Sequence, residues 1–195
     1  MKKPFTIKAK LKDVINDGKR IKFKRTSDLV SYKEFISFFE KLKIITEHDL
    51  IIGINFTYGW MPTIFEFTSN EIKSATAILN KVKTDTLLTS AELTTLRNLF
   101  NNSLVGTSKL LHFINPKVYA IWDSRVYYYL TKMTAYDYKL KNVDSYLEYL
   151  NWIKTVIADE NFKNLKKEII NKVGYNISDY RTVEIILYSF GQKAI

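Results

Sequence analysis

Two ionisable residues, Lys109 and Asp123, stand where an enzyme could place a nucleophile and its charge partner. Lys109 falls in the first turn of an apolar helical segment, just after a short turn that contains Gly106. Asp123 ends the apolar run Val118-Tyr-Ala-Ile-Trp-Asp123 and directly precedes another predicted helix. A lysine amine that has lost its proton is a nucleophile, and a carboxylate stabilises positive charge that develops on a substrate. The stretch between residues 104 and 126 therefore indicates an activity.

Breaks in the apolar pattern define the elements that carry this pair. The segment 102–109 joins two short predicted helices, near 90–101 and 107–114. Asn115-Pro116 interrupts the chain, and the next helix is predicted near 124–132. Lys109 and Asp123 are thus expected at the beginnings of two helices that follow one another in the sequence.

The hairpin segment also predicts contacts with phosphate. Backbone amides at a glycine turn and at a helix N-terminus suit a DNA phosphate. Gly106, Thr107 and Ser108 are therefore candidate DNA contacts. Arg125, at the start of the next helix, is a further candidate, with a plain surface role as the alternative.

Most of the remaining chain has helical spacing. Thr68-x-x-Glu71 and Thr89-x-x-Glu92 fit the capping box, in which a hydroxyl and a carboxylate satisfy the free amides of a first turn. Within residues 50–67, the segment 50–56 is predicted as a buried strand or a short helix, 58–62 as an aromatic loop and 63–67 as an extended piece. The fold class is mainly α, with further helices expected near 31–42, 70–82, 143–157, 160–173 and 179–190.

The N-terminus predicts a small β element. Phe5, Ile7, Ala9 and Leu11 alternate with polar and basic residues, and Asp17-Gly18 is a hairpin turn signal before the alternation resumes at residue 21. We expect residues 1–67 to hold this hairpin, a helix and an aromatic loop, and residues 68–195 to form the helical domain, both within one compact unit.

Charge is concentrated at the same end of the chain. Ten of the first 25 residues are Lys or Arg and two are Asp, a net charge of +8 out of +10 for all 195 residues. This excess favours duplex DNA as partner over a membrane, because the arm has no bulky amphipathic helix to insert. The alternative is a solvated strand edge that lysines protect from pairing.

Composition excludes several other classes of protein. The chain has no Cys and only two His, so a disulfide framework, a thiolate metal site and a histidine-rich metal centre are excluded. No apolar run approaches the length of a membrane span, and the charged N-terminus lacks the core of a signal peptide. We therefore expect a cytoplasmic protein without metal or cofactor.

Leu104-Val-Gly-Thr-Ser-Lys109 followed by Val118-Tyr-Ala-Ile-Trp-Asp123 resembles the helix-hairpin-helix DNA glycosylase superfamily, and within it the 8-oxoguanine DNA glycosylase branch. The resemblance covers roughly residues 90–131. It implies a helix-hairpin-helix fold, binding of duplex DNA, and excision of a damaged base with abasic-site lyase activity. Lys109 would then be the nucleophile that forms a Schiff base, and Asp123 would stabilise the sugar cation.

A flipped base would also need a pocket, and four residues are candidates for it. His112 lies three residues after Lys109, Trp122 adjoins Asp123, and Tyr58 and Trp60 belong to the aromatic segment 58–61. Core packing is the alternative for each of them. Lys109 could instead contact only phosphate, and Asp123 could serve only as a helix N-cap. The alternative functions are a non-catalytic nucleic-acid-binding module and a helical scaffold or protein-interaction domain whose N-terminal lysines only aid solubility.

Overall fold

The computed structural model describes residues 5–23, 27–60 and 69–191, which form eleven helices and no β-strand. They divide into two compact units. The first, called the terminal unit, combines residues up to 23 with those from 121 onward. The second, called the central unit, consists of residues 27–60 and 69–120. The mainly α class is confirmed, whereas the expected boundary at residue 67 does not coincide with this division.

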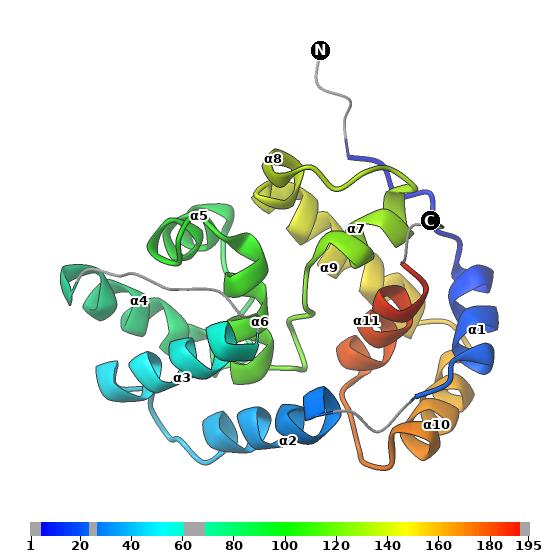
Figure 1. Ribbon diagram of the computed structural model, residues 1–195, viewed down its shortest axis with the longest axis horizontal. Coiled ribbons are helices and arrows are strands. Elements are labelled where there is room, and N and C mark those ends of the chain that lie inside the picture. Colours follow the sequence, from blue (N-terminus) through cyan, green and yellow to red (C-terminus); the bar gives the residue numbers. More distant parts are fainter. Residues whose placement is uncertain (1–4, 24–26, 61–68, 192–195) are drawn as a thin grey trace. The chain divides into compact units, whose positions relative to one another are not determined.

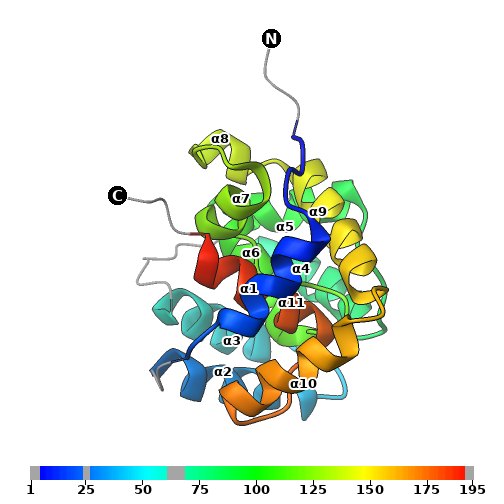
Figure 2. The same ribbon diagram turned by 90° about the vertical axis from the view of Figure 1, so that its right-hand side faces the viewer.

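A buried helix organises the terminal unit. Residues 180–187 of α11 are buried around the whole helix, and α11 contacts α1, α7, α9 and α10 (Figure 1). A helix without a polar face needs neighbours on every side, which explains this arrangement. Helices α1 and α10 also lie side by side (Figure 2). The helices of this unit are α1 (Leu11–Arg20), α7 (Ser124–Thr131), α8 (Asp137–Leu140), α9 (Val143–Ile157), α10 (Phe162–Val173) and α11 (Asp179–Phe190).

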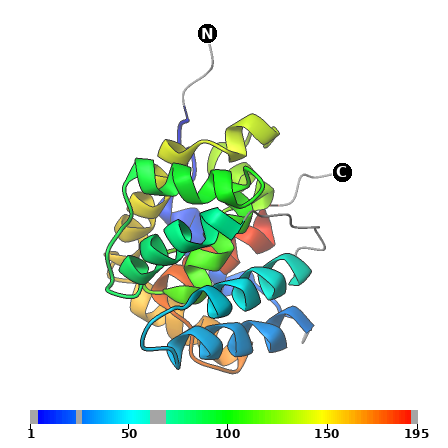
Figure 3. The same ribbon diagram turned by 90° about the vertical axis from the view of Figure 1, so that its left-hand side faces the viewer.

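The central unit is built around α6, whose residues are buried except for two half-buried positions, Val105 and Lys109. Helix α6 contacts α2, α3, α4 and α5, and α2 lies along α3 (Figure 3). An aromatic cluster fills the space between α2, α3 and α6, with the rings of Phe35 and Phe56 stacked at 4.4 Å. The helices are α2 (Ser27–Glu40), α3 (Glu47–Trp60), α4 (Ser69–Val82), α5 (Ser90–Leu99) and α6 (Leu104–Ile114).

The predicted N-terminal hairpin is wrong, because residues 11–20 form helix α1. Val14, Ile15 and Gly18 lie on its buried face. Gly18 lies on a closely packed helix face and not in a turn: a Cβ there would lie 2.4 Å from Cδ1 of Leu165 and 2.9 Å from Cδ1 of Ile186, so these side chains would have to shift. The spacing of Val14, Ile15 and Gly18 fits one face of a helix, but the Asp17-Gly18 pair is also typical of a hairpin turn and led to the wrong prediction.

Residues 5–10 precede α1 without regular secondary structure, and Lys10, directly before the helix, is extended. Phe5, Ile7 and Ala9 are half-buried, whereas Lys8 and Lys10 are exposed. The amides of Lys8 and Ala9 both donate to the carbonyl of Leu130, at 2.7 and 3.1 Å. This segment therefore lies on the end of α7 with its basic side in solvent.

Residues 50–56 belong to α3, so the helical alternative holds there, whereas the loop predicted from residue 58 is wrong over 58–60 because α3 continues to Trp60. The extended piece predicted over 63–67, residues 61–62 of the aromatic loop, and Thr68 of the first capping box lie outside the described residues. The helices predicted over 143–157 and 179–190 are confirmed at both ends.

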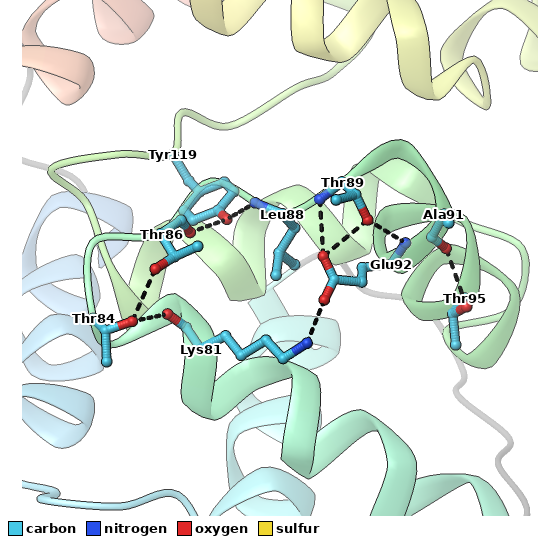
Figure 4. A network of polar contacts seen from close by, with 9 residues as sticks. All are labelled: Lys81, Thr84, Thr86, Leu88, Thr89, Ala91, Glu92, Thr95 and Tyr119. Atoms are coloured by element: carbon cyan, nitrogen blue, oxygen red, sulfur yellow. Dashed lines mark hydrogen bonds and ion pairs between the residues drawn. The ribbon is translucent and has the colours of Figure 1, made fainter.

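The second capping box is confirmed at the start of α5 (Figure 4). The hydroxyl of Thr89 accepts from the amide of Glu92, and the Glu92 carboxylate accepts from the amide of Thr89 at 2.9 Å. Lys81 adds an ion pair to the same carboxylate at 2.7 Å. The hydrogen bond from Lys81, with those from Thr89, lowers the pKa of Glu92 to about 2.

Candidate functional site

The turn between α5 and α6 is made by two asparagines and not by Gly106. Asn101 and Asn102 have φ angles of 54° and 51°, in the left-handed region that Asn tolerates better than most residues. Helix α6 then begins at Leu104, with Ser103 as its N-cap; the Ser103 hydroxyl accepts from the amide of Gly106 at 3.1 Å. The expected hairpin is therefore shifted by several residues toward the N-terminus.

Gly106, Thr107 and Ser108, the expected phosphate contacts, are buried inside the first turns of α6. The Thr107 hydroxyl donates to the carbonyl of Ser103 at 2.8 Å, and that of Ser108 to the carbonyl of Val105 at 2.9 Å. The absence of a side chain at Gly106 makes room for Tyr58, whose Oη would lie 2.6 Å from a Cβ. These three residues serve the helix and its packing, and their side chains offer no donor at the surface.

Lys109 lies on the second turn of α6, where its side chain is half-buried. Its Nζ lies 5.3 Å from the centre of the Trp60 ring, within the range of a cation–π contact. Trp60 in turn meets the rings of Phe35 and Phe113 edge to face. Its Nε1 is buried and has no hydrogen-bond partner among the described residues. Lys109 is thus an amine at the margin of an aromatic cluster.

His112 and Tyr58, two of the pocket candidates, belong to the core. Both ring nitrogens of the buried His112 are engaged: Nε2 lies 2.8 Å from Oη of Tyr32 and Nδ1 lies 2.6 Å from the carbonyl oxygen of Tyr119. The Tyr58 hydroxyl donates to the carbonyl of Phe100 at 2.9 Å, and burial raises the pKa of Tyr58 to about 12. The core alternative is confirmed for both.

Asp123 is the N-cap of α7, as the structural alternative predicted. Its Oδ1 accepts from the amide of Val126 at 2.9 Å, and its side chain is half-buried. A cap role does not prevent a carboxylate from acting on a substrate, since the second oxygen carries the same shared charge. Lys109 belongs to the central unit and Asp123 to the terminal unit.

Trp122 and Arg125, on either side of Asp123, have structural partners within the terminal unit. Trp122 is fully buried; its Nε1 donates to the carbonyl of Leu140 at 3.0 Å and its ring centre lies 5.3 Å from that of Tyr149. The guanidinium of Arg125 lies 4.5 Å from the centre of the Tyr188 ring. The core alternative is confirmed for Trp122, and Arg125 rests half-buried on an aromatic surface.

One buried ionic feature was missed by sequence reasoning. Arg181 and Glu184 form an ion pair on α11, with side chains 8 % and 2 % exposed. Burial raises the pKa of the nearby Tyr149 well above its ordinary value, and the negative charges of Glu184 and Asp123 add to that effect. The sequence does contain a pattern that fits this pair: Arg181 and Glu184 have opposite charges and stand three residues apart on one predicted helix.

Comparison with known proteins gives no relative for this chain: no family model, no curated protein and no solved structure matches it.

Two further properties bear on the kind of site that is possible. Among the described helices, none combines the length and the apolar character that crossing a membrane requires. The same residues contain no group of three or more His, Cys, Asp or Glu side chains arranged to hold a metal ion.

Proposed function

We propose that this protein is a DNA glycosylase with lyase activity, which binds duplex DNA and excises a damaged base, an oxidised purine, through a Schiff base on Lys109. The observation that carries the proposal is the state of the ionisable groups of α6. That helix has two, and His112 is buried with both nitrogens engaged. Lys109 is the other one; it is half-buried, and its Nζ lies 5.3 Å from the centre of the Trp60 ring, an aromatic surface of the kind on which bases stack.

The proposed reaction proceeds in balanced steps. The neutral Lys109 amine attacks C1′ of the nucleotide, and the bond between C1′ and the base breaks, so that the base leaves with the bonding electrons and takes up a proton. Opening of the sugar ring gives an iminium ion. Loss of a C2′ proton then expels the 3′ phosphate by β-elimination, and water releases the amine. Asp123 is assigned the stabilisation of the positive charge that builds on the sugar.

A second function is favoured by one observation. The Lys109 ammonium over the Trp60 ring is equally suited to contact a phosphate while an exposed base stacks nearby. The protein would then be a nucleic-acid-binding module without catalysis, and the same residues would contribute affinity only.

Borohydride trapping separates the two functions. The protein is incubated with duplexes that contain 8-oxoguanine or an abasic site, and the Schiff base is reduced to a stable adduct. We expect an adduct with the wild type and with Lys117→Gln, a control that removes an exposed lysine of the same unit. Lys109→Gln should lose the adduct while retaining duplex binding. Binding without an adduct on either duplex would establish the non-catalytic module instead.

Asp123 can be tested without losing the helix cap. Asn caps helices about as well as Asp, so Asp123→Asn keeps the bond to the Val126 amide and removes only the charge. We expect the trapping rate to fall about 100-fold in this variant, in the range seen when one group that stabilises a charged transition state is removed. An unchanged rate with an unchanged melting temperature would restrict Asp123 to its role as a cap.

A further inference from the structure

A polar hollow of about 630 Å³, open to solvent, lies in the terminal unit. Side chains of α1 and of the end of α7 line it, and α1 faces the viewer in Figure 2. Three of the lining residues are cationic and two are carboxylates. Those used below are Asp13, Asp17, Lys19, Arg20, Tyr129 and Lys132.

A hydrogen-bonded framework forms one wall of the hollow. The hydroxyl of the buried Tyr129 donates to Oδ2 of Asp17 at 2.6 Å, and the Arg20 guanidinium forms an ion pair with Oδ1 of the same carboxylate. Both oxygens of Asp17 therefore accept hydrogen bonds, and Asp17 holds the Arg20 guanidinium through one of its nitrogens. Arginine has five N–H donors, so the remaining ones can bind an oxyanion at the same time.

Lys132 lies at the C-terminal end of α7, where its backbone conformation and an aromatic ring hold it in place. It closes α7 in the left-handed conformation, with φ of 56°, and its amide donates to the carbonyl of Tyr128 at 2.7 Å. Its Nζ lies 4.4 Å from the centre of the Tyr129 ring. Tyr129 therefore organises two of the three cations of the hollow, Arg20 through Asp17 and Lys132 through its ring face.

A row of exposed lysines extends from this hollow. Within the described residues, no carboxylate lies within ion-pair distance of Lys19 or of the flanking lysines. The flanking lysines are Lys8, Lys10, Lys12 and Lys22, all of them exposed. Unpaired cations along the N-terminal segment and a helix offer a series of contacts to a polymer with regularly spaced negative charges.

We propose that this hollow and its lysine rim, with Lys19, Arg20 and Lys132 as the central contacts, hold the phosphodiester backbone of duplex DNA. The proposal rests on the DNA binding of the proposed function, and it moves the backbone contacts from the buried first turn of α6 to the terminal unit. A membrane is disfavoured as partner because the apolar side of α1, with Val14 and Ile15, is already buried in the protein. Asp13 is exposed beside the hollow and opposes an anion there.

The test compares two variants that have the same net charge. Lys19→Gln/Lys132→Gln removes two cations of the hollow, and Lys154→Gln/Lys163→Gln removes two exposed cations of α9 and α10 in the same unit. Binding to an undamaged fluorescent duplex is measured by anisotropy over a series of salt concentrations. The slope of log K against log salt is negative, and its magnitude falls by about 0.9 for each phosphate contact that is lost.

We expect the hollow variant to reduce the magnitude of the slope by roughly 1.8 and the affinity by at least about tenfold. The control variant should change the magnitude of the slope by less than about 0.5. Asp13→Asn should strengthen binding about two- to threefold, because it removes an opposing charge. Equal effects of the two double variants would overturn the proposal in favour of diffuse attraction. Binding to phosphatidylserine vesicles but not to the duplex would overturn it as well.

Failure of this proposal can be told apart from failure of the proposed catalysis. If the wild type forms the borohydride adduct and the hollow variant binds duplex as the wild type does, the hollow is not the backbone site and the catalytic proposal stands. If the wild type binds duplex through the hollow but forms no adduct, the present proposal stands and the catalytic one fails.

Discussion

The terminal and central units differ in their net charge and in the charged groups that they bury. The described residues of the terminal unit contain 16 Lys and Arg against 11 Asp and Glu, whereas those of the central unit contain nine against eight. The terminal unit also encloses an ion pair, Arg181 with Glu184. The buried polar residues of the central unit are Thr, Ser, Asn and His. The main example is His112, whose two ring nitrogens contact the Tyr32 hydroxyl and the Tyr119 carbonyl.

Because of this difference, the two proposals assign DNA binding and catalysis to different units of the chain. The basic surface suited to a polyanion lies on the terminal unit, while the lysine proposed as nucleophile lies on the nearly neutral central unit. Each unit also depends on a different kind of internal contact. Substitutions inside the two units should therefore differ in size, and the following predictions rank them.

The largest effect is expected from breaking the ion pair of the terminal unit. Glu184→Gln leaves the Arg181 charge buried without its partner, which costs about 3–5 kcal/mol of unfolding free energy. Urea unfolding of this variant and of Glu148→Gln, an exposed control on α9, measures the difference. Replacing the pair together, as Arg181→Met/Glu184→Leu, should cost far less. A loss below about 1 kcal/mol in Glu184→Gln would contradict a role of the pair in the stability of this unit.

A smaller effect is expected from the neutral network of the central unit. His112→Leu removes two hydrogen bonds and leaves the Tyr119 carbonyl and the Tyr32 hydroxyl without their partner, at a cost of about 2–3 kcal/mol. Tyr32→Phe, which removes one of the two bonds, should cost about 1 kcal/mol. Trp60 belongs to the central unit, so its fluorescence in a variant without Trp122 and Trp152 follows this unit alone. Equal costs for the two variants would show that only the bond to Tyr32 matters.

The capping box should contribute about 1 kcal/mol, and its contribution should depend on pH. The pKa of Glu92 is lowered from 4.5 to about 2, so its stabilisation is fully present above pH 4.5 and is lost as the pH falls toward 2. The stability difference between wild type and Glu92→Gln should therefore shrink over that range. Urea unfolding at pH 7, 4.5 and 2.5 checks this, with the exposed Glu34→Gln as control. A difference that stays constant down to pH 2.5 would exclude the carboxylate as its source.

The smallest effect is expected from the ion pair on top of that capping box. The Lys81 side chain is 59 % exposed, so water screens its attraction to Glu92, and Lys81→Gln should cost no more than about 0.5 kcal/mol. Salt should abolish even this difference. Thermal unfolding at low and high salt measures it, and a cost that persists at high salt would indicate a contact other than the ion pair.

The sequence alone determined the features that arise between near neighbours. The capping box of Thr89 and Glu92, the cap at Asp123 and the two helices of 143–157 and 179–190 depend on hydrogen bonds between residues three or four positions apart. A pattern of this length is visible in one sequence, because both partners and their spacing are printed side by side. Lys109 was placed near the start of a helix for the same reason.

Tertiary structure decided which of these residues are accessible and why each glycine is present. Gly18 was expected in a turn but lies inside α1, where it packs closely against the side chains of Leu165 and Ile186. Thr107, Ser108 and Trp122 were candidates for contact with DNA, yet packing by distant segments buries them. Lys19 and Arg20 likewise line a hollow only because the fold brings Tyr129 and Lys132 beside them. Burial depends on contacts between residues far apart in the sequence, such as Gly18 with Leu165, and no local pattern encodes those contacts.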